Sequence, residues 1–174
     1  MGIFVNFIGF QIGWFACVIG AAKGQPLLGI ICAFLIVAIH LYRNRSYAEF
    51  YIILIAILIG FVWESLLVAS GWLSYINTAD SEIFAPVWLV AMWALFATTI
   101  NLSMAWLKGR WLAAAVMGAI FGPLAFVAGE KLGAVEFANQ STALMALALG
   151  WACLMPLLLR LADQFQHFVK PMDI

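Results

Sequence analysis

The chain has 174 residues, of which 67% are hydrophobic and only 9% are charged. Soluble domains carry about 25% charged residues, so this composition excludes an ordinary soluble domain and indicates a membrane protein. Eight basic and eight acidic side chains give a formal net charge of zero, which argues against a nucleic-acid partner because such a partner requires a basic surface.

Six long apolar runs, nearly free of charge, form the main pattern of the sequence. Each is about as long as the roughly 20 apolar residues that span a bilayer. Backbone polar groups inside a bilayer must bond within their own segment, so we interpret these runs as helices. The predicted spans are 3–22, 25–42, 49–72, 85–107, 110–129 and 141–160. They predict an all-α fold, a bundle of six transmembrane helices that forms a single domain over residues 1–174.

The first predicted helix, 3–22, carries a polar and an aromatic residue near its middle. No basic residue precedes it, so we interpret it as a retained helix rather than a signal peptide. Gln11 comes three residues before Trp14, which places both side chains on the same helix face. The pair is a candidate for lining a site, although amides in membranes more commonly hold helices together.

Glu64 is the single charged residue between positions 50 and 79, and it lies inside the predicted helix 49–72. A charged side chain at the centre of a membrane helix costs about 2.5–3.5 kcal/mol on insertion scales. Such residues usually face the bundle interior and mark a functional site. The alternative is a neutral glutamic acid that makes one hydrogen bond between helices and serves only packing.

Several tryptophans lie near the middle of their helices, although tryptophan usually collects at the membrane interfaces. They are Trp14, Trp63, Trp93 and Trp151. Because consecutive helices run in opposite directions, Trp93 falls at about the level of Glu64. This arrangement predicts a pocket with aromatic walls around a carboxylate, and the alternative is that the rings simply fill the core.

The predicted helix 85–107 adds two polar residues, Thr98 and Asn101, on one stripe. Asn101 lies about one turn from the level of Glu64, so a bond between them requires another group or a water molecule. The two residues are candidates for the pocket or for hydrogen bonds between helices.

The predicted helix 110–129 carries a face of small residues at intervals of about four. They are Ala114, Gly118, Gly122 and Gly129. Such a face lets another helix approach closely, so we interpret these residues as packing positions.

The basic residues predict the orientation in the membrane. One side of the alternating topology receives Arg43, Arg45, Lys108, Arg110, Arg160 and Lys170. The other side receives Lys23, Lys131 and the acidic pair Asp80 and Glu82. By the positive-inside rule, both termini are expected in the cytoplasm.

Metal and catalytic chemistry find no support in the sequence. His40 and His167 have no second histidine or carboxylate at ligand spacing, so no metal site is expected. We find no Ser–His–acid set, no phosphate-binding loop and no His-Glu-x-x-His run. No catalytic residue and no cofactor is therefore predicted, and an enzyme activity rests on no motif.

Three stretches carry a resemblance to other proteins: NFIGFQIGWFACVIGA at 6–21, PVWLVAMWALFATTINLSMAW at 86–106 and GAIFGPLAFVAGEKLGA at 118–134. Together they cover much of the chain. The chain resembles an uncharacterised family of short bacterial inner-membrane proteins, a domain of unknown function with six predicted spans. The resemblance implies a multi-pass protein of the bacterial inner membrane and implies no activity.

Our leading functional hypothesis is a membrane-embedded Glu/Trp pocket for an apolar or amphipathic small molecule, such as a lipid or an isoprenoid. One alternative is proton-coupled transport through Glu64. Another is a structural subunit that binds itself or another membrane protein through the predicted helix 110–129. The expected partners are membrane lipids, with no nucleic acid among them.

Overall fold

The computed structural model describes residues 2–76 and 83–168 of the chain. Its elements are α1 (Ile3–Ala22), α2 (Pro26–Asn44), α3 (Tyr47–Ala69), β1 (Leu73–Tyr75), α4 (Val87–Ile100), the 3₁₀ helix η1 (Ala105–Leu107), α5 (Trp111–Lys131), β2 (Val135–Phe137) and α6 (Gln140–Phe168). The all-α prediction is confirmed. Asp80, Glu82 and Lys170, which the orientation argument used, lie outside the described residues.

Five helices, α1, α2, α3, α5 and α6, are long and apolar enough to cross a bilayer. The outside of the bundle is apolar, as Leu28 and Phe34 on α2 show with 61% and 69% of their surface exposed. Polar side chains lie inside instead, and Glu64 and His40 are both 0% exposed. This distribution is the reverse of that in a soluble protein, and the chain is a multi-pass membrane protein.

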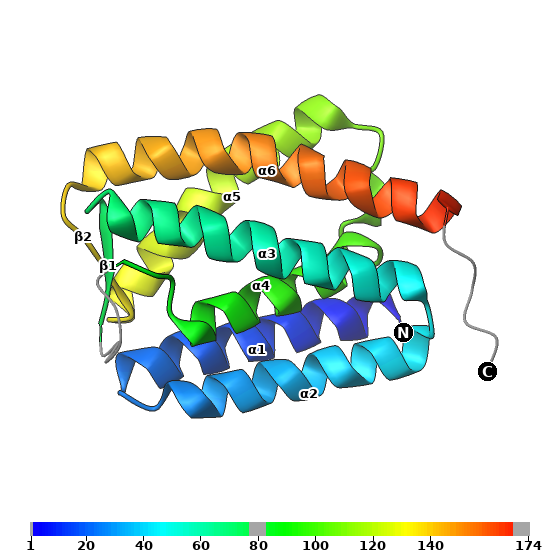
Figure 1. Ribbon diagram of the computed structural model, residues 1–174, viewed down its shortest axis with the longest axis horizontal. Helices are drawn as coiled ribbons and strands as arrows, with labels where there is room; N and C mark the ends of the chain where they lie inside the picture. The colour runs from blue at the N-terminus through cyan, green and yellow to red at the C-terminus, as the bar shows by residue number, and fades with distance from the viewer. Residues whose placement is uncertain (1, 77–82, 169–174) are drawn as a thin grey trace.

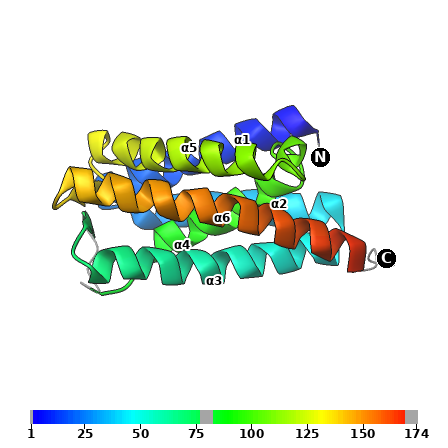
Figure 2. The ribbon, with the colours of Figure 1, turned by 90° about the horizontal axis from the view of Figure 1, so that it is seen from above.

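The helices lie side by side along the long axis of the molecule, and α1 begins at the same end at which α6 finishes (Figure 1). α4 lies at the centre, where it packs against α1, α2 and α3. α1 and α5 lie along one face of the bundle and α3 along the opposite one (Figure 2). α5 packs mainly on α6, whereas α1 packs mainly on α2.

The predicted helix 85–107 is wrong in its last third, because α4 has only 14 residues and ends at Ile100. At about 1.5 Å per residue it spans roughly 21 Å, less than the roughly 30 Å of a hydrocarbon core. The side-chain amide of Asn6 donates to the Thr98 carbonyl at 3.0 Å, and the Leu102 amide turns to the Thr99 carbonyl. In a continuing α-helix the Leu102 N–H would donate to the Thr98 carbonyl. Asn6 donates to that carbonyl instead, and the helix ends. Apolar composition alone could not predict this, because the interruption depends on a contact with α1.

Two short strands, absent from the sequence prediction, join the long connections at one end of the bundle. β1 and β2 pair antiparallel, with Leu73 opposite Phe137 and Tyr75 opposite Val135. The pairing links the α3–α4 connection to the α5–α6 connection (Figure 1).

The small residues predicted as a packing face on α5 lie mostly against α6. A methyl group added at Gly118 or Gly122 would overlap Trp151, on its backbone or its ring, and Ala114 is 0% exposed. Gly129 instead lies near Val135 of β2. Because α6 of the same chain covers the face formed by Ala114, Gly118 and Gly122, that face is occupied within the chain.

α1 has the predicted bounds 3–22, and the other helix ends differ from their predicted positions, most of all the end of α6. α3 ends at Ala69 rather than at 72. Ser70 and Gly71 form a turn after it, and Gly71 has a positive φ. α6 continues past the predicted end at 160 to Phe168, so the amphipathic segment after the apolar run is also helical.

Candidate functional site

Glu64 lies on α3 with its side chain fully buried, and both carboxyl oxygens accept hydrogen bonds. The indole N–H of Trp93 on α4 donates to Oε1 at 3.1 Å. The hydroxyl of Tyr75 on β1 donates to Oε2 at 2.9 Å. Because α3 and α4 run antiparallel, Trp93 lies at the level of Glu64. The carboxyl group is therefore bonded to one residue of a neighbouring helix and to one residue of a strand.

Tyr75 remains a hydrogen-bond donor far into the alkaline range. Burial raises the pKa of the Tyr75 hydroxyl well above its ordinary value because the phenolate would lack solvation, and the neighbouring Glu64 raises it further. The Tyr75 hydroxyl is therefore protonated at neutral pH and can donate to Glu64.

A helical glycine provides the space for each of two central tryptophans, Trp93 and Trp151. A methyl group at Gly60 would overlap the ring of Trp93, and one at Gly122 would overlap the ring of Trp151. The two indoles stack with centroids 5.0 Å apart and planes 13° from parallel. The glycines thus let α3 and α5 approach these large rings, which form one continuous aromatic wall.

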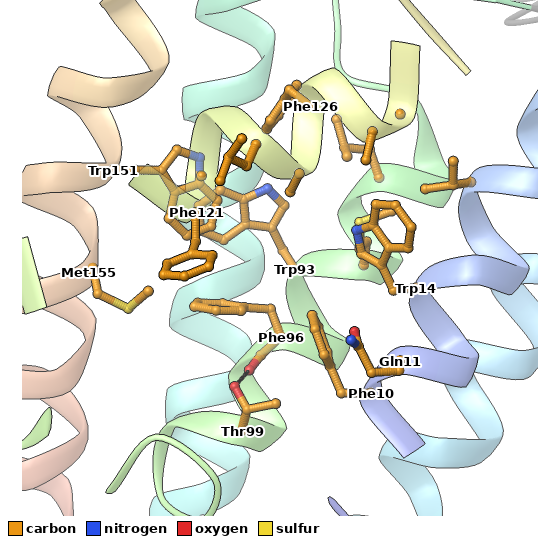
Figure 3. A pocket seen from close by; sticks show the side chains of 18 of the residues that line it. Phe10, Gln11, Trp14, Trp93, Phe96, Thr99, Phe121, Phe126, Trp151 and Met155 are labelled. Atoms are coloured by element: carbon orange, nitrogen blue, oxygen red, sulfur yellow. Dashed lines mark hydrogen bonds between the residues drawn. The ribbon is translucent and has the colours of Figure 1, made fainter. Parts of the chain in front are cut away.

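A cavity of about 640 Å³ lies in front of this wall. It extends between α1, α4 and α5, and α6 contributes Trp151 and Met155 at its back. Figure 3 shows aromatic rings converging on it from several helices. The rings labelled there are Phe10, Trp14, Trp93, Phe96, Phe121, Phe126 and Trp151.

The cavity opens sideways, between α1 and α5. Phe7 and Phe15 of α1 line it and are 47% and 48% exposed, and Phe121 and Leu124 of α5 line it and are 54% and 52% exposed. These apolar side chains lie on the part of the surface that faces the hydrocarbon of a bilayer. The mouth is therefore bordered by apolar side chains.

Gln11 is a polar residue of the cavity wall. Its amide extends from α1 beside Phe10 and Trp14 (Figure 3). Within residues 2–76 and 83–168, no hydrogen bond to this amide is formed. Trp14, the other α1 candidate, lines the cavity next to it.

The remaining predicted site residues lie outside the cavity. Trp63 packs on Gly150 of α6, where a methyl group would overlap its ring. The Thr98 hydroxyl donates to the Leu95 carbonyl at 2.7 Å. The side-chain amide of Asn101 is buried without a partner in the described part of the chain, and so is the indole nitrogen of Trp63. Glu64, Trp93, Trp14, Trp151 and Gln11 are thus the candidates that the fold brings to one cavity.

Sequence reasoning missed Tyr75, which comes eleven residues after Glu64. It also missed a buried pair at the other end of the bundle. His40 Nε2 lies 2.9 Å from Glu49 Oε2, and both side chains are at most 7% exposed. The spacing of nine residues across the α2–α3 turn was the available signal, since antiparallel neighbours of a tight turn face each other.

A family comparison matches residues 3–157 to the family described as protein of unknown function (DUF2878), and the chain belongs to this family. The match agrees with the resemblance seen in the sequence and covers all six helices up to the last turns of α6. Searches of curated proteins and of solved structures find no match.

Proposed function

We propose that this protein binds an apolar or amphipathic small molecule, a lipid or an isoprenoid, within the membrane. The observation that carries the proposal is the cavity of about 640 Å³ that opens between α1 and α5. Its volume falls within the range of about 300–1,000 Å³ typical of small-molecule sites. Its mouth faces the hydrocarbon region, from which such a molecule enters sideways.

The shape of the cavity favours an elongated occupant. Its lining on α1 runs from Phe7 to Val18, and its lining on α5 runs from Met117 to Gly129. At about 1.5 Å per residue, each wall is roughly 17 Å long. A cavity of that length and of this volume is narrow, so a single hydrocarbon chain fits it better than a broad ring system.

Dispersion contacts supply the affinity for such a chain. Leaving a lipid bilayer gives a hydrocarbon no hydrophobic gain, because lipid tails are as apolar as the cavity wall. Fixed rings of Trp93, Trp151 and Phe96 instead offer close contacts on several sides, and an unfilled cavity forgoes them. In this proposal Glu64 is a positioning residue, which orients Trp93 and Tyr75 through the hydrogen bonds described above.

Binding is favoured over the two alternatives. Glu64 is 0% exposed and both its oxygens accept hydrogen bonds, an arrangement that suits a fixed support better than a group that exchanges protons with water. The small-residue face of α5 is covered by α6, which removes the specific motive for a docking role.

We further propose the bacterial cytoplasmic membrane as the location, with both termini in the cytoplasm. Arg43 lies in the last turn of α2, Arg45 follows in the α2–α3 connection, and Lys108 and Arg110 lie in the α4–α5 connection. These segments are at the end of the bundle where α1 begins (Figure 1). The positive-inside rule supports this orientation.

The test is mass spectrometry of the molecules that copurify with the protein in a mild detergent. Ala125 lines the cavity on α5, and Ala125→Phe fills it. Val116 lies on the lipid-facing side of α5 and is 48% exposed, so Val116→Phe is the matched control. We expect one defined molecule with the wild type and the control and its loss from Ala125→Phe. The same bulk phospholipids in all three samples would refute the proposal.

A further inference from the structure

Gln11 is a feature of the cavity that an apolar ligand alone does not explain, and the buried, unpaired indole N–H groups of Trp88 and Trp151 in the described part of the chain are two others. Gln11 is eight residues from the start of α1 at Ile3, so it lies about 12 Å along a helix of roughly 30 Å. Its amide lines the cavity without a hydrogen-bond partner among the described residues. At this depth the bilayer offers no water to satisfy it.

An amide in this position is costly unless its ligand bonds to it. Burying an amide in apolar surroundings is unfavourable when its donor and acceptor groups remain unpaired. The amide offers two N–H donors and one carbonyl acceptor, so it can bond a hydroxyl, a carbonyl or another amide. A plain hydrocarbon satisfies none of these groups.

The charges around the cavity indicate an uncharged ligand. Among the described residues, no lysine, arginine or histidine lines the cavity, so an anionic group would find no counter-ion there. Glu64 is the acidic residue of the wall, and its oxygens are already bonded to Trp93 and Tyr75. A cationic head group would have to break those hydrogen bonds to reach it.

We propose that Gln11 is the recognition residue of the cavity and that the ligand is an uncharged single-chain amphiphile with a hydroxyl, carbonyl or amide group. This inference rests on the proposed binding function and deepens it by naming the chemical class. Trp14 and Phe10 flank the amide (Figure 3), so the polar group of the ligand lies between aromatic rings while its chain follows the groove.

The experiment measures quenching of tryptophan emission by brominated sixteen-carbon chains that differ only in their end group. The probes are the alkane, the primary alcohol, the primary amide, the carboxylate and the amine, each added to the full-length protein in detergent. Gln11→Met keeps the length of the side chain and removes its hydrogen bonds. Ile12→Met is the control, because Ile12 is 57% exposed on the outside of α1.

We expect the alcohol and the amide to bind about five- to tenfold more tightly than the alkane in the wild type, the effect of one hydrogen bond. Gln11→Met should abolish this advantage and leave alkane binding unchanged, and Ile12→Met should change neither. An advantage that survives in Gln11→Met, or tightest binding of the carboxylate or the amine, would overturn the role of Gln11. If no probe binds, the alkane included, the proposed function itself fails.

Discussion

Replacing Gly60 with alanine tests the fit between α3 and the aromatic wall. The added methyl group would overlap Cγ and Cδ2 of Trp93, which are atoms near the base of the ring and not the end of a flexible chain. Overpacking of this kind costs about 1–3 kcal/mol, and displacing the indole also removes its hydrogen bond to Glu64, about 1 kcal/mol or more. Alanine in place of glycine returns about 1 kcal/mol of helix propensity. The net loss of unfolding free energy is therefore about 2 kcal/mol.

Thermal unfolding in detergent, followed by tryptophan emission, measures this change. For a chain of this size about 2 kcal/mol corresponds to a melting temperature lower by roughly 4–8 °C. Gly9→Ala is the matched control, because a methyl group there meets only Ile36 Cγ2 at 3.7 Å, an ordinary contact. It should melt at or slightly above the wild-type temperature. A Gly60→Ala protein as stable as Gly9→Ala would refute the placement of the Trp93 ring against Gly60.

Two further predictions concern the carboxylate and its donors. Glu64→Gln should lower the unfolding free energy by about 1–2 kcal/mol because one carbonyl oxygen replaces two acceptors. Glu64→Ala should lower it by about 3–5 kcal/mol because it also leaves a void and two unpaired donors; equal melting of the two variants would contradict this network. Because the pKa of Tyr75 is raised, the unfolded protein releases a proton near pH 10 that the folded protein retains, so this stabilisation is complete below about pH 10 and is lost above it. Melting temperatures between about pH 9 and pH 12 should therefore fall more steeply for the wild type than for Tyr75→Phe, and parallel curves would show that Tyr75 is not buried against Glu64.

The helices could be predicted from the sequence because uncharged runs of spanning length leave the backbone few alternatives in a bilayer. Counting residues from the helix ends also placed Trp93 at the level of Glu64, and the two side chains hydrogen bond. The end of α4 could not be predicted in this way. It depends on Asn6, a residue more than ninety positions earlier whose amide takes the Thr98 carbonyl.

The cavity could be predicted only in part. Gln11 and Trp14 were grouped from their spacing on one helix face, and both line it. Tyr75 joins the site through the pairing of β1 with β2, a contact between two connections far apart in the chain that leaves no periodic signal in three-residue strands. Trp63 sits beside Glu64 in the sequence but points to α6 instead, because neighbouring residues of a helix face different directions.

The paired strands β1 and β2 attach one end of the α5–α6 hairpin to the α3–α4 connection. This hairpin meets the rest of the bundle mainly along α3 and through the two-stranded sheet, whose hydrogen bonds hold one end of it. At the other end of the cavity lie Met104 and Trp106, in turns and a single 3₁₀ segment. A chain-shaped molecule that enters sideways between α1 and α5 would therefore lie in a groove bounded by the paired strands at one end and by turns at the other.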